Sequence, residues 1–265
     1  MKKVAFILFG QVKNYNDVQH AQFTKNVLSK LKNFEIDFYL TTSKSNQYIS
    51  PRNNENYPIN HASIFEFFDF KQVVFDDISN KLSTFERFAD YLVNTLNFKA
   101  WGEHSLISTI NSLKQIYSLN YFYNLFFEKI SNYDYFILSR SDLFFTHELF
   151  LPNLLLENIY VPDWGHYGNR AWYGGQYRNN AGCNDRFCII TCEKILQIYC
   201  NRYNSLELKP EPYHAEIYLQ DQLLNNNIKF KQIKNFKFRF LRSNNIISSM
   251  RSSQPDLELT KKYYK

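Results

Sequence analysis

The sequence predicts an α/β protein with a mostly parallel central sheet flanked by helices. Continuous apolar runs such as Val4–Phe9 and Tyr135–Leu138 are typical of strands buried on both faces, which occur in parallel sheets covered by helices. Stretches of helical periodicity separate these runs, and a regular alternation of strand and helix is typical of a doubly wound sheet. With 265 residues, the chain is long enough to bury a sizeable core. We expect one domain over residues 1–242.

Residues 1–150 carry the clearest alternation of predicted strands and helices. In chain order we expect strands at Val4–Phe9, Phe34–Leu40, Lys71–Phe75 and Tyr135–Leu138, and helices at about 17–31, 83–97 and 105–131. Residues 41–60 contain two prolines and several asparagines, so we expect a loop that is long enough to be functional or mobile. A broad apolar stripe on residues 105–131 predicts that this helix covers the sheet.

Residues 151–242 contain shorter predicted elements. We expect strands at Ile159–Pro162, Asp185–Ile190 and Ile228–Ile233, and helices at Cys192–Tyr203 and Ala215–Asn226. Between the first two of these strands, residues 163–184 are rich in Gly, Asn, Trp and Tyr and show little periodicity, so we expect a loop region. Residues 243–265 are polar, and we expect them to form a carboxyl-terminal tail.

The charge of the chain favours anionic small molecules over nucleic acid as partners. The formal net charge is +6 and the pI is about 8.9, but the Lys and Arg residues are scattered rather than gathered in a stripe. The densest basic stretch, Asn235–Arg242, alternates like a strand. We therefore expect no nucleic-acid partner, while nucleoside diphosphates or an acidic membrane surface suit this charge.

The cysteines and the amino terminus indicate the cellular compartment. All four cysteines fall within residues 183–200, and no nearby histidine completes a zinc set, so free buried thiols in a reducing compartment are favoured. The apolar run after Lys3 is too short for a signal peptide, and no stretch approaches the length of a membrane span. We expect a cytoplasmic protein that can contact a membrane surface peripherally.

Polar residues follow the first predicted strand directly. Gly10 permits a tight turn, and Gln11, Lys13 and Tyr15 supply donors that can face a base, a ribose or a phosphate. Ligands of open α/β sheets bind beyond the carboxyl ends of strands, which is where these residues are expected. The patterns of the common Gly-rich phosphate loops are absent, so an ordinary turn is the alternative.

The most informative block is residues 133–145 (YDYFILSRSDLFF), in which Arg140, Ser141 and Asp142 stand at the end of a predicted strand. A buried charge requires a partner, so one interpretation is an ion pair between Arg140 and Asp142 or Asp134. The functional interpretation is that Asp142 presents oxygen to a divalent metal ion, Mg²⁺ or Mn²⁺, which bridges phosphate oxygens.

A long helix that leads into this block resembles the corresponding stretch of GT-A glycosyltransferases that build bacterial or viral polysaccharides. The resemblance covers residues 1–240 in layout and implies a GT-A-like, Rossmann-like fold. Its donor half would be residues 1–150, and its acceptor-side half would be residues 151–242. It further implies a UDP- or GDP-sugar donor, a glycan or other hydroxyl acceptor, and Mn²⁺ or Mg²⁺ at an aspartate motif. Here Arg140 replaces the first acid of that motif, so Arg140 can itself neutralise phosphate.

The same resemblance assigns roles to residues of the second half. The helix at 215–226 resembles the one that carries the catalytic acid in inverting enzymes, so Glu216 is the first candidate for the general base and Asp221 the second. A surface helix with ordinary Glu and Asp side chains is the alternative for either residue. Asp185 lies in a stretch that resembles a sugar-contact region, with a turn or strand cap as the alternative. Arg239 and Arg242 can reach the diphosphate, and a solvated charged strand is the alternative.

Aromatic residues supply the expected acceptor contacts. Trp164, Tyr167, Trp172 and Tyr173 can stack on sugar rings. His166 and His214 flank this region and are candidate metal ligands, although a lone histidine is more often structural. Two other functions remain open at this stage: a nucleotidyltransferase, which shares the sheet and the phosphate chemistry, and a carbohydrate- or RNA-binding module.

Overall fold

The computed structural model describes residues 1–50, 55–97, 104–130, 132–151, 153–163, 170–173, 176–179, 182–208, 214–242, 244–249 and 255–264, with only the backbone described for 170–173 and 176–179. Its main strands are β1 (Lys2–Phe9), β2 (Phe34–Ser43), β5 (Phe70–Asp76), β6 (Tyr135–Arg140), β7 (Leu143–Phe145), β8 (Ile159–Pro162), β11 (Phe187–Ile190), β12 (Phe230–Ile233) and β13 (Phe238–Phe240). Two short hairpins are β3 (Gln47–Ser50) with β4 (Glu55–Pro58), and β9 (Arg170–Tyr173) with β10 (Gln176–Asn179). Its α-helices are α1 (Asp17–Asn26), α2 (Leu82–Asp90), α3 (Ser105–Ile130), α4 (Glu193–Asn201), α5 (Ala215–Asn225) and α6 (Leu257–Tyr263).

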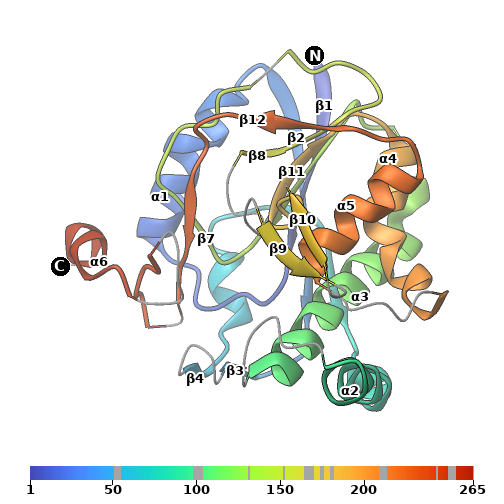
Figure 1. The fold of residues 1–265 in the computed structure, drawn as a ribbon. Helices are drawn as coiled ribbons and strands as arrows, with labels where there is room; N and C mark the ends of the chain where they lie inside the picture. The colour runs from blue at the N-terminus through green and yellow to red at the C-terminus, as the bar shows by residue number, and fades with distance from the viewer. Residues whose placement is uncertain are drawn as a thin grey trace.

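Seven strands form the central sheet in the order β12-β8-β11-β6-β1-β2-β5 (Figure 1). β1 pairs in parallel with both β2 and β6, and the pairs β2–β5 and β8–β12 are also parallel. β11 runs antiparallel to its neighbours β6 and β8. The predicted α/β class with a mixed, mostly parallel sheet is therefore confirmed.

Helices cover both faces of this sheet, as Figure 1 shows for α1 on one side and α3, α4 and α5 on the other. Side chains of β1 alternate between the two faces. Phe9 belongs to the core that contains Leu119 of α3 and Leu196 of α4. Phe6 points the other way and packs edge-on against Phe23 of α1, with ring centroids 5.3 Å apart. Burial on both faces explains why the first strand is continuously apolar.

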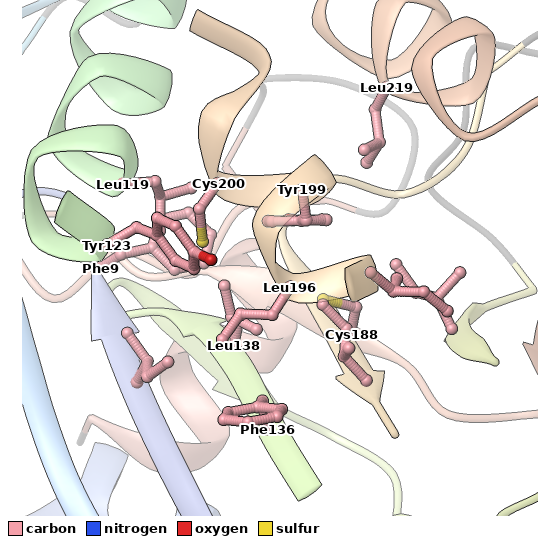
Figure 2. Packing of buried hydrophobic residues seen from close by; sticks show 14 of the residues in the cluster. Phe9, Leu119, Tyr123, Phe136, Leu138, Cys188, Leu196, Tyr199, Cys200 and Leu219 are labelled. Atoms are coloured by element: carbon pink, nitrogen blue, oxygen red, sulfur yellow. The ribbon is translucent and has the colours of Figure 1, made fainter. Parts of the chain in front are cut away.

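The cysteines lie in the core on the α3–α5 side. Figure 2 shows Cys188 and Cys200 among Leu138, Leu196 and Tyr199. All four cysteines are free, and burial raises the pKa of the Cys200 thiol to about 12. The prediction of buried free thiols is confirmed for Cys183, Cys188 and Cys200, whereas Cys192 is only partly buried. Within the described residues no three His, Cys, Asp or Glu side chains gather as a metal site would require.

Helix α1 starts where the sequence predicts, because Asn16 caps it. The Asn16 side chain accepts a hydrogen bond of 3.0 Å from the backbone N–H of Gln19, a contact that typically contributes about 1 kcal/mol. The helix ends at Asn26 and is followed by a 3-10 turn at Leu28–Lys30. The predicted helix of residues 17–31 is therefore two elements.

Two regions differ from the sequence-based expectation. Residues 41–60 are not one loop: β2 continues to Ser43, and β3 and β4 form an antiparallel hairpin. The tail of residues 243–265 contains α6, whose Tyr263 packs on Phe144 with ring centroids 5.0 Å apart. The hydroxyl of Tyr264 donates a 3.1 Å hydrogen bond to Asn16. A few aromatic contacts thus anchor a segment whose composition is polar.

No helix within the described parts of the chain combines the length and the apolar character needed to cross a bilayer.

Candidate functional site

The order of strands reverses at β1. From β1 the chain proceeds to β2 and β5 on one side, and it later returns to β6 on the other side. Ligands of open α/β sheets bind beyond the carboxyl ends of the strands at such a switch point. Phe9 and Arg140 are register partners at the ends of β1 and β6, so the segments that follow them lie side by side. Sequence reasoning predicted both segments as the donor-binding edge.

Hydrogen bonds join the two segments into one rigid edge. The N–H of Ser141 donates to the carbonyl of Phe9 at 2.9 Å, and the Ser141 hydroxyl donates to the carbonyl of Gln11 at 3.0 Å. The side chain of Gln19 in α1 donates to the carbonyls of Ser141 and Leu143. Gly10 has a φ of 89°, a conformation that favours glycine and turns the chain out of β1.

Asp142 is the centre of a buried ion cluster. Its side chain accepts two hydrogen bonds from Arg140, at 2.8 Å from Nε and 2.7 Å from Nη2. The ammonium of Lys13 lies 3.2 Å from Oδ2 of the same carboxylate. Asp142 is only 4% exposed, and the Lys13 side chain is equally enclosed. Both predicted segments therefore contribute a cation to one acid.

The electrostatics of this cluster keep all three groups charged. Burial by itself raises the pKa of Asp142, but Arg140 and Lys13 hold it well below its usual range. Burial lowers the pKa of Lys13, whereas Tyr48 and Asp142 raise it, and the net result is an increase. Burial also lowers the pKa of Arg140, but the contact with Asp142 raises it by more, so the net result is an increase. The cluster is thus two cations and one anion at neutral pH.

The hairpin of residues 47–58 closes over Lys13. The Lys13 ammonium lies 3.9 Å from the centroid of the Tyr48 ring, a cation–π contact. Glu55 of the same hairpin forms a buried ion pair with Arg242, at 2.8 Å. Arg242 was predicted as a donor contact, and the structure brings it to the neighbourhood of Lys13 through this pair.

A second set of charges adjoins the first. Arg140 donates from Nη1 to the side chain of Gln115 in α3 at 3.2 Å, and Gln115 donates in turn to Asp185 at 3.4 Å. Arg186 forms an ion pair of 2.6 Å with Glu216 of α5. These contacts place two predicted acids, Asp185 and Glu216, beside the Asp142 cluster.

The ring of Phe240 links the two sets. The guanidinium carbons of Arg140 and Arg186 lie 4.9 and 5.4 Å from its centroid. Phe240 reaches this position because the next N–H, that of Leu241, donates to the carbonyl of Asp142 at 2.9 Å. The end of β13 is therefore tied directly to the end of β6.

Three predicted site residues lie away from these contacts. Tyr15 packs in the core against Phe67 and Phe68, and burial raises its pKa well above the usual value. Arg239 neighbours Phe240 on β13, so its side chain points to the opposite face. Asp221 lies five residues beyond Glu216 on α5, about 7.5 Å further along the helix axis.

The predicted acceptor contacts are not described by the structure. Trp164, Tyr167 and His166 lie outside the described residues, and only the backbone of Trp172 and Tyr173 is described, as part of β9. His214 immediately precedes α5 and is buried.

Several residues of the cluster were not identified from the sequence as site residues: Tyr48, Glu55, Gln115, Arg186 and Phe240. Arg186 directly follows the predicted Asp185, so its position was the available signal. The others lie in a hairpin, a helix and a strand that have no motif, and they reach the site only through tertiary contacts.

Among the residues that the structure describes, those around Asp142 do not form a set of metal ligands. A hard divalent ion takes several oxygen ligands. Both oxygens of Asp142 are engaged by cations, while Asp185 and Glu216 contact Gln115 and Arg186. The expectation of Mn²⁺ or Mg²⁺ at Asp142 stays a prediction. The contacts of Asp142 do not support it, because the side chains that contact this carboxylate are cationic.

No protein-family model matches the chain, and a search of curated proteins finds no relative. The fold and geometry establish an α/β protein with a mixed, mostly parallel sheet and a buried charged cluster at its switch point.

Proposed function

We propose that the chain is a glycosyltransferase of the GT-A type that uses a nucleotide-sugar donor. One observation carries this proposal: Lys13 and Arg140 converge at the switch point of the sheet, with Asp185 and Glu216 beside them. Cations at this edge suit a diphosphate, and acids beside them suit the activation of a hydroxyl. A Rossmann-like, mostly parallel sheet flanked by helices is also what the sequence resemblance implies.

The two cations keep donors for a ligand. Within the described part of the chain, three of the five N–H groups of the Arg140 guanidinium donate to Asp142 and Gln115, which leaves two. Lys13 directs one of its three N–H groups to Asp142. The role that we assign to Asp142 is to orient both cations, so that they meet the diphosphate without further reorganisation.

We propose a reaction that uses these positions. A carboxylate, Glu216 in the first place and Asp185 in the second, takes the proton of the acceptor hydroxyl. The acceptor oxygen then bonds to the anomeric carbon, and the bond from that carbon to the diphosphate oxygen breaks. Lys13 and Arg140 stabilise the negative charge that develops on the leaving diphosphate. No step passes through a metal ion, because the groups around Asp142 do not fit one.

A thermal-shift panel tests the proposal. The ligands are UDP, GDP, CMP, dTDP and their sugars, each with Mn²⁺ and with EDTA. A ligand at 100 times its Kd stabilises the native state by about 2.7 kcal/mol, which raises the Tm of a chain of this size by roughly 5–10 °C. We expect one nucleotide to raise the Tm both with Mn²⁺ and with EDTA. If EDTA abolished the increase in Tm, nucleotide binding would depend on a metal ion, as the sequence-based expectation for Asp142 has it.

Lys13→Met makes the test specific to the site. A hydrogen bond to a charged group contributes about 1.5–3 kcal/mol, so this variant should bind the nucleotide roughly 10- to 100-fold more weakly. Lys237→Met is the matched control, since Lys237 lies beside Thr146 and away from the cluster. Equal Tm increases in both variants, or no increase with any nucleotide, would contradict the proposed function.

Product analysis separates the proposal from a nucleotidyltransferase. A glycosyltransferase releases a nucleoside diphosphate from the donor, whereas a nucleotidyltransferase releases pyrophosphate. Binding of a nucleotide with no turnover on any sugar acceptor would instead favour a binding module.

A further inference from the structure

The segment of residues 146–158 connects β7 to β8, and the structure describes all of it except Pro152. The described part exposes large apolar side chains. Phe150 is 79% exposed, Leu155 54% and Leu156 76%. Single exposed apolar residues are normal on protein surfaces, but three within seven consecutive positions are not a scattered occurrence. This feature is separate from the charged cluster and does not depend on the proposed function.

Polar side chains hold this segment in the shape that exposes the leucines. The hydroxyl of Tyr160 accepts a hydrogen bond of 2.9 Å from the N–H of Leu155. The side-chain amide of Asn158 donates to the carbonyl of Leu156 at 2.6 Å. Glu157, which lies between Leu156 and Asn158 in the chain, has a φ of 56°, and this value is uncommon for a residue other than Gly, Asn or Asp. The exposed leucines therefore belong to a defined turn.

Basic residues surround the same segment. Four lysines lie close enough to act on this segment or to contact its neighbours: Lys25 and Lys30 near Glu148, Lys237 near His147, and Lys231 near Tyr160. Lys30 forms an ion pair of 2.7 Å with Glu148, and the Lys231 ammonium lies 5.8 Å from the centroid of the Tyr160 ring. The segment itself contains two acids, Glu148 and Glu157, so the four neighbouring lysines outnumber the acids of the segment.

The end of the segment that carries Leu155 and Leu156 lies at the edge of the sheet opposite the charged cluster. It ends where β8 begins, and Ile159 aligns across β11 with Phe136, near the start of β6. The cluster lies beyond the end of β6. A partner bound to residues 146–158 would therefore leave the carboxyl edge of the sheet open.

We propose that residues 146–158 dock the protein peripherally onto an anionic lipid surface. Phe150, Leu155 and Leu156 enter the boundary between headgroups and acyl chains, while the lysines contact anionic headgroups. The positive charge disfavours a second copy of the chain as the occupant, because a two-fold contact would bring the same lysines together.

Vesicle co-sedimentation tests this docking. We expect the protein to bind vesicles of phosphatidylcholine that contain phosphatidylserine, to bind pure phosphatidylcholine at least tenfold more weakly, and to lose binding as salt rises. The double variant Leu155→Glu and Leu156→Glu should bind the anionic vesicles at least tenfold more weakly than the wild type. Leu257→Glu is the matched control, because Leu257 is 59% exposed but lies on α6. The control should bind as the wild type does.

Circular dichroism and nucleotide binding of the double variant should be unchanged, which separates this test from that of the proposed function. Absence of binding by the wild type would overturn the proposal, and so would equal binding by the double variant. A wild-type dimer that the double variant abolishes, without vesicle binding, would reassign the surface to self-association and overturn it as well.

Discussion

Asp142 and Asp76 are two buried aspartates at the same edge of one sheet, and they differ in the cations that contact their carboxylates. Asp142 follows β6 and is 4% exposed, and Asp76 ends β5 and is 1% exposed. Asp142 has Arg140 and Lys13 in direct contact. Neither carboxylate oxygen of Asp76 accepts a hydrogen bond from the described residues.

The two pKa values move in opposite directions for this reason. Burial raises the pKa of Asp76 to about 6, with Ser118 and Lys114 opposing the increase and Asp77 adding to it. At Asp142 the same burial is outweighed by two cations, and the pKa falls well below the usual range. Burial alone therefore does not decide the charge of an acid at this edge. The presence of a cation within hydrogen-bond distance decides it.

Removal of Asp142 should give the largest effect. Asp142→Ala removes the acid that pairs with the buried Lys13 and the partly buried Arg140, and breaking a buried pair in this way typically costs about 3–5 kcal/mol. Because the pKa of Asp142 is lowered, its contribution is complete above pH of about 4 and is lost as the pH falls further. Urea denaturation at pH 7 measures the loss of unfolding free energy.

Glu35→Ala is the control for Asp142→Ala, since the ion pair of Glu35 with Lys3 is half exposed and such pairs contribute about 0–1 kcal/mol. A loss in Asp142→Ala no larger than that of the control would break the comparison.

Asp76→Asn should have a smaller effect of the opposite sign. The increase in pKa from 3.8 to about 6 means that ionising Asp76 in the folded state costs roughly 3 kcal/mol of stability. The cost develops as the pH rises from about 4 to about 6, so the variant should be more stable than the wild type at pH 8 and similar to it at pH 4. Chemical denaturation at both pH values measures this difference. The neighbouring Asp77 is exposed and its pKa is lowered, so Asp77→Asn should not stabilise the protein. Equal wild-type and Asp76→Asn stabilities at pH 8 would contradict the account of Asp76.

Tyr48→Leu should give the smallest effect. It removes the ring 3.9 Å from the Lys13 ammonium, and a cation–π contact of this kind contributes about 1 kcal/mol. Tyr48→Phe keeps the ring and should retain most of the stability. The midpoints of urea denaturation of the two variants give the comparison. If both variants lose the same free energy, the Tyr48 hydroxyl and not the ring supports Lys13.

The parts of the fold that could be predicted from the sequence are segments with a pattern of apolar residues at neighbouring positions. Val4–Phe9 and Ile159–Pro162 are apolar throughout, because strands buried on both faces have no polar side, and both are strands in the structure. The hairpin of β3 and β4 was missed, since its strands have four residues each, half of these residues are exposed, and they have no alternating apolar pattern. The helix α6 was missed because Tyr263 depends on a distant partner, Phe144.

The candidate site divides in the same way. Strand ends can be located from apolar runs, and therefore Lys13, Arg140 and Asp142 were identified together. Their ion cluster could not be deduced, because the sequence does not specify whether the Asp142 carboxylate contacts a cationic side chain or a metal ion. Arg242 and Glu55 are 187 positions apart, and Arg186 meets Glu216 across two different elements.

By itself, the sequence determined the α/β class, the order of the main elements and the two strand ends that carry polar residues. These depend on periodicity and on turn residues, which act within a few positions of the chain. The tertiary structure alone decided which charges meet, that Asp142 pairs with cations whereas no described Lys or Arg forms an ion pair with Asp76, and that Leu155 and Leu156 are exposed. Those outcomes depend on the register of strands and the packing of helices, which bring together residues that are far apart in the sequence.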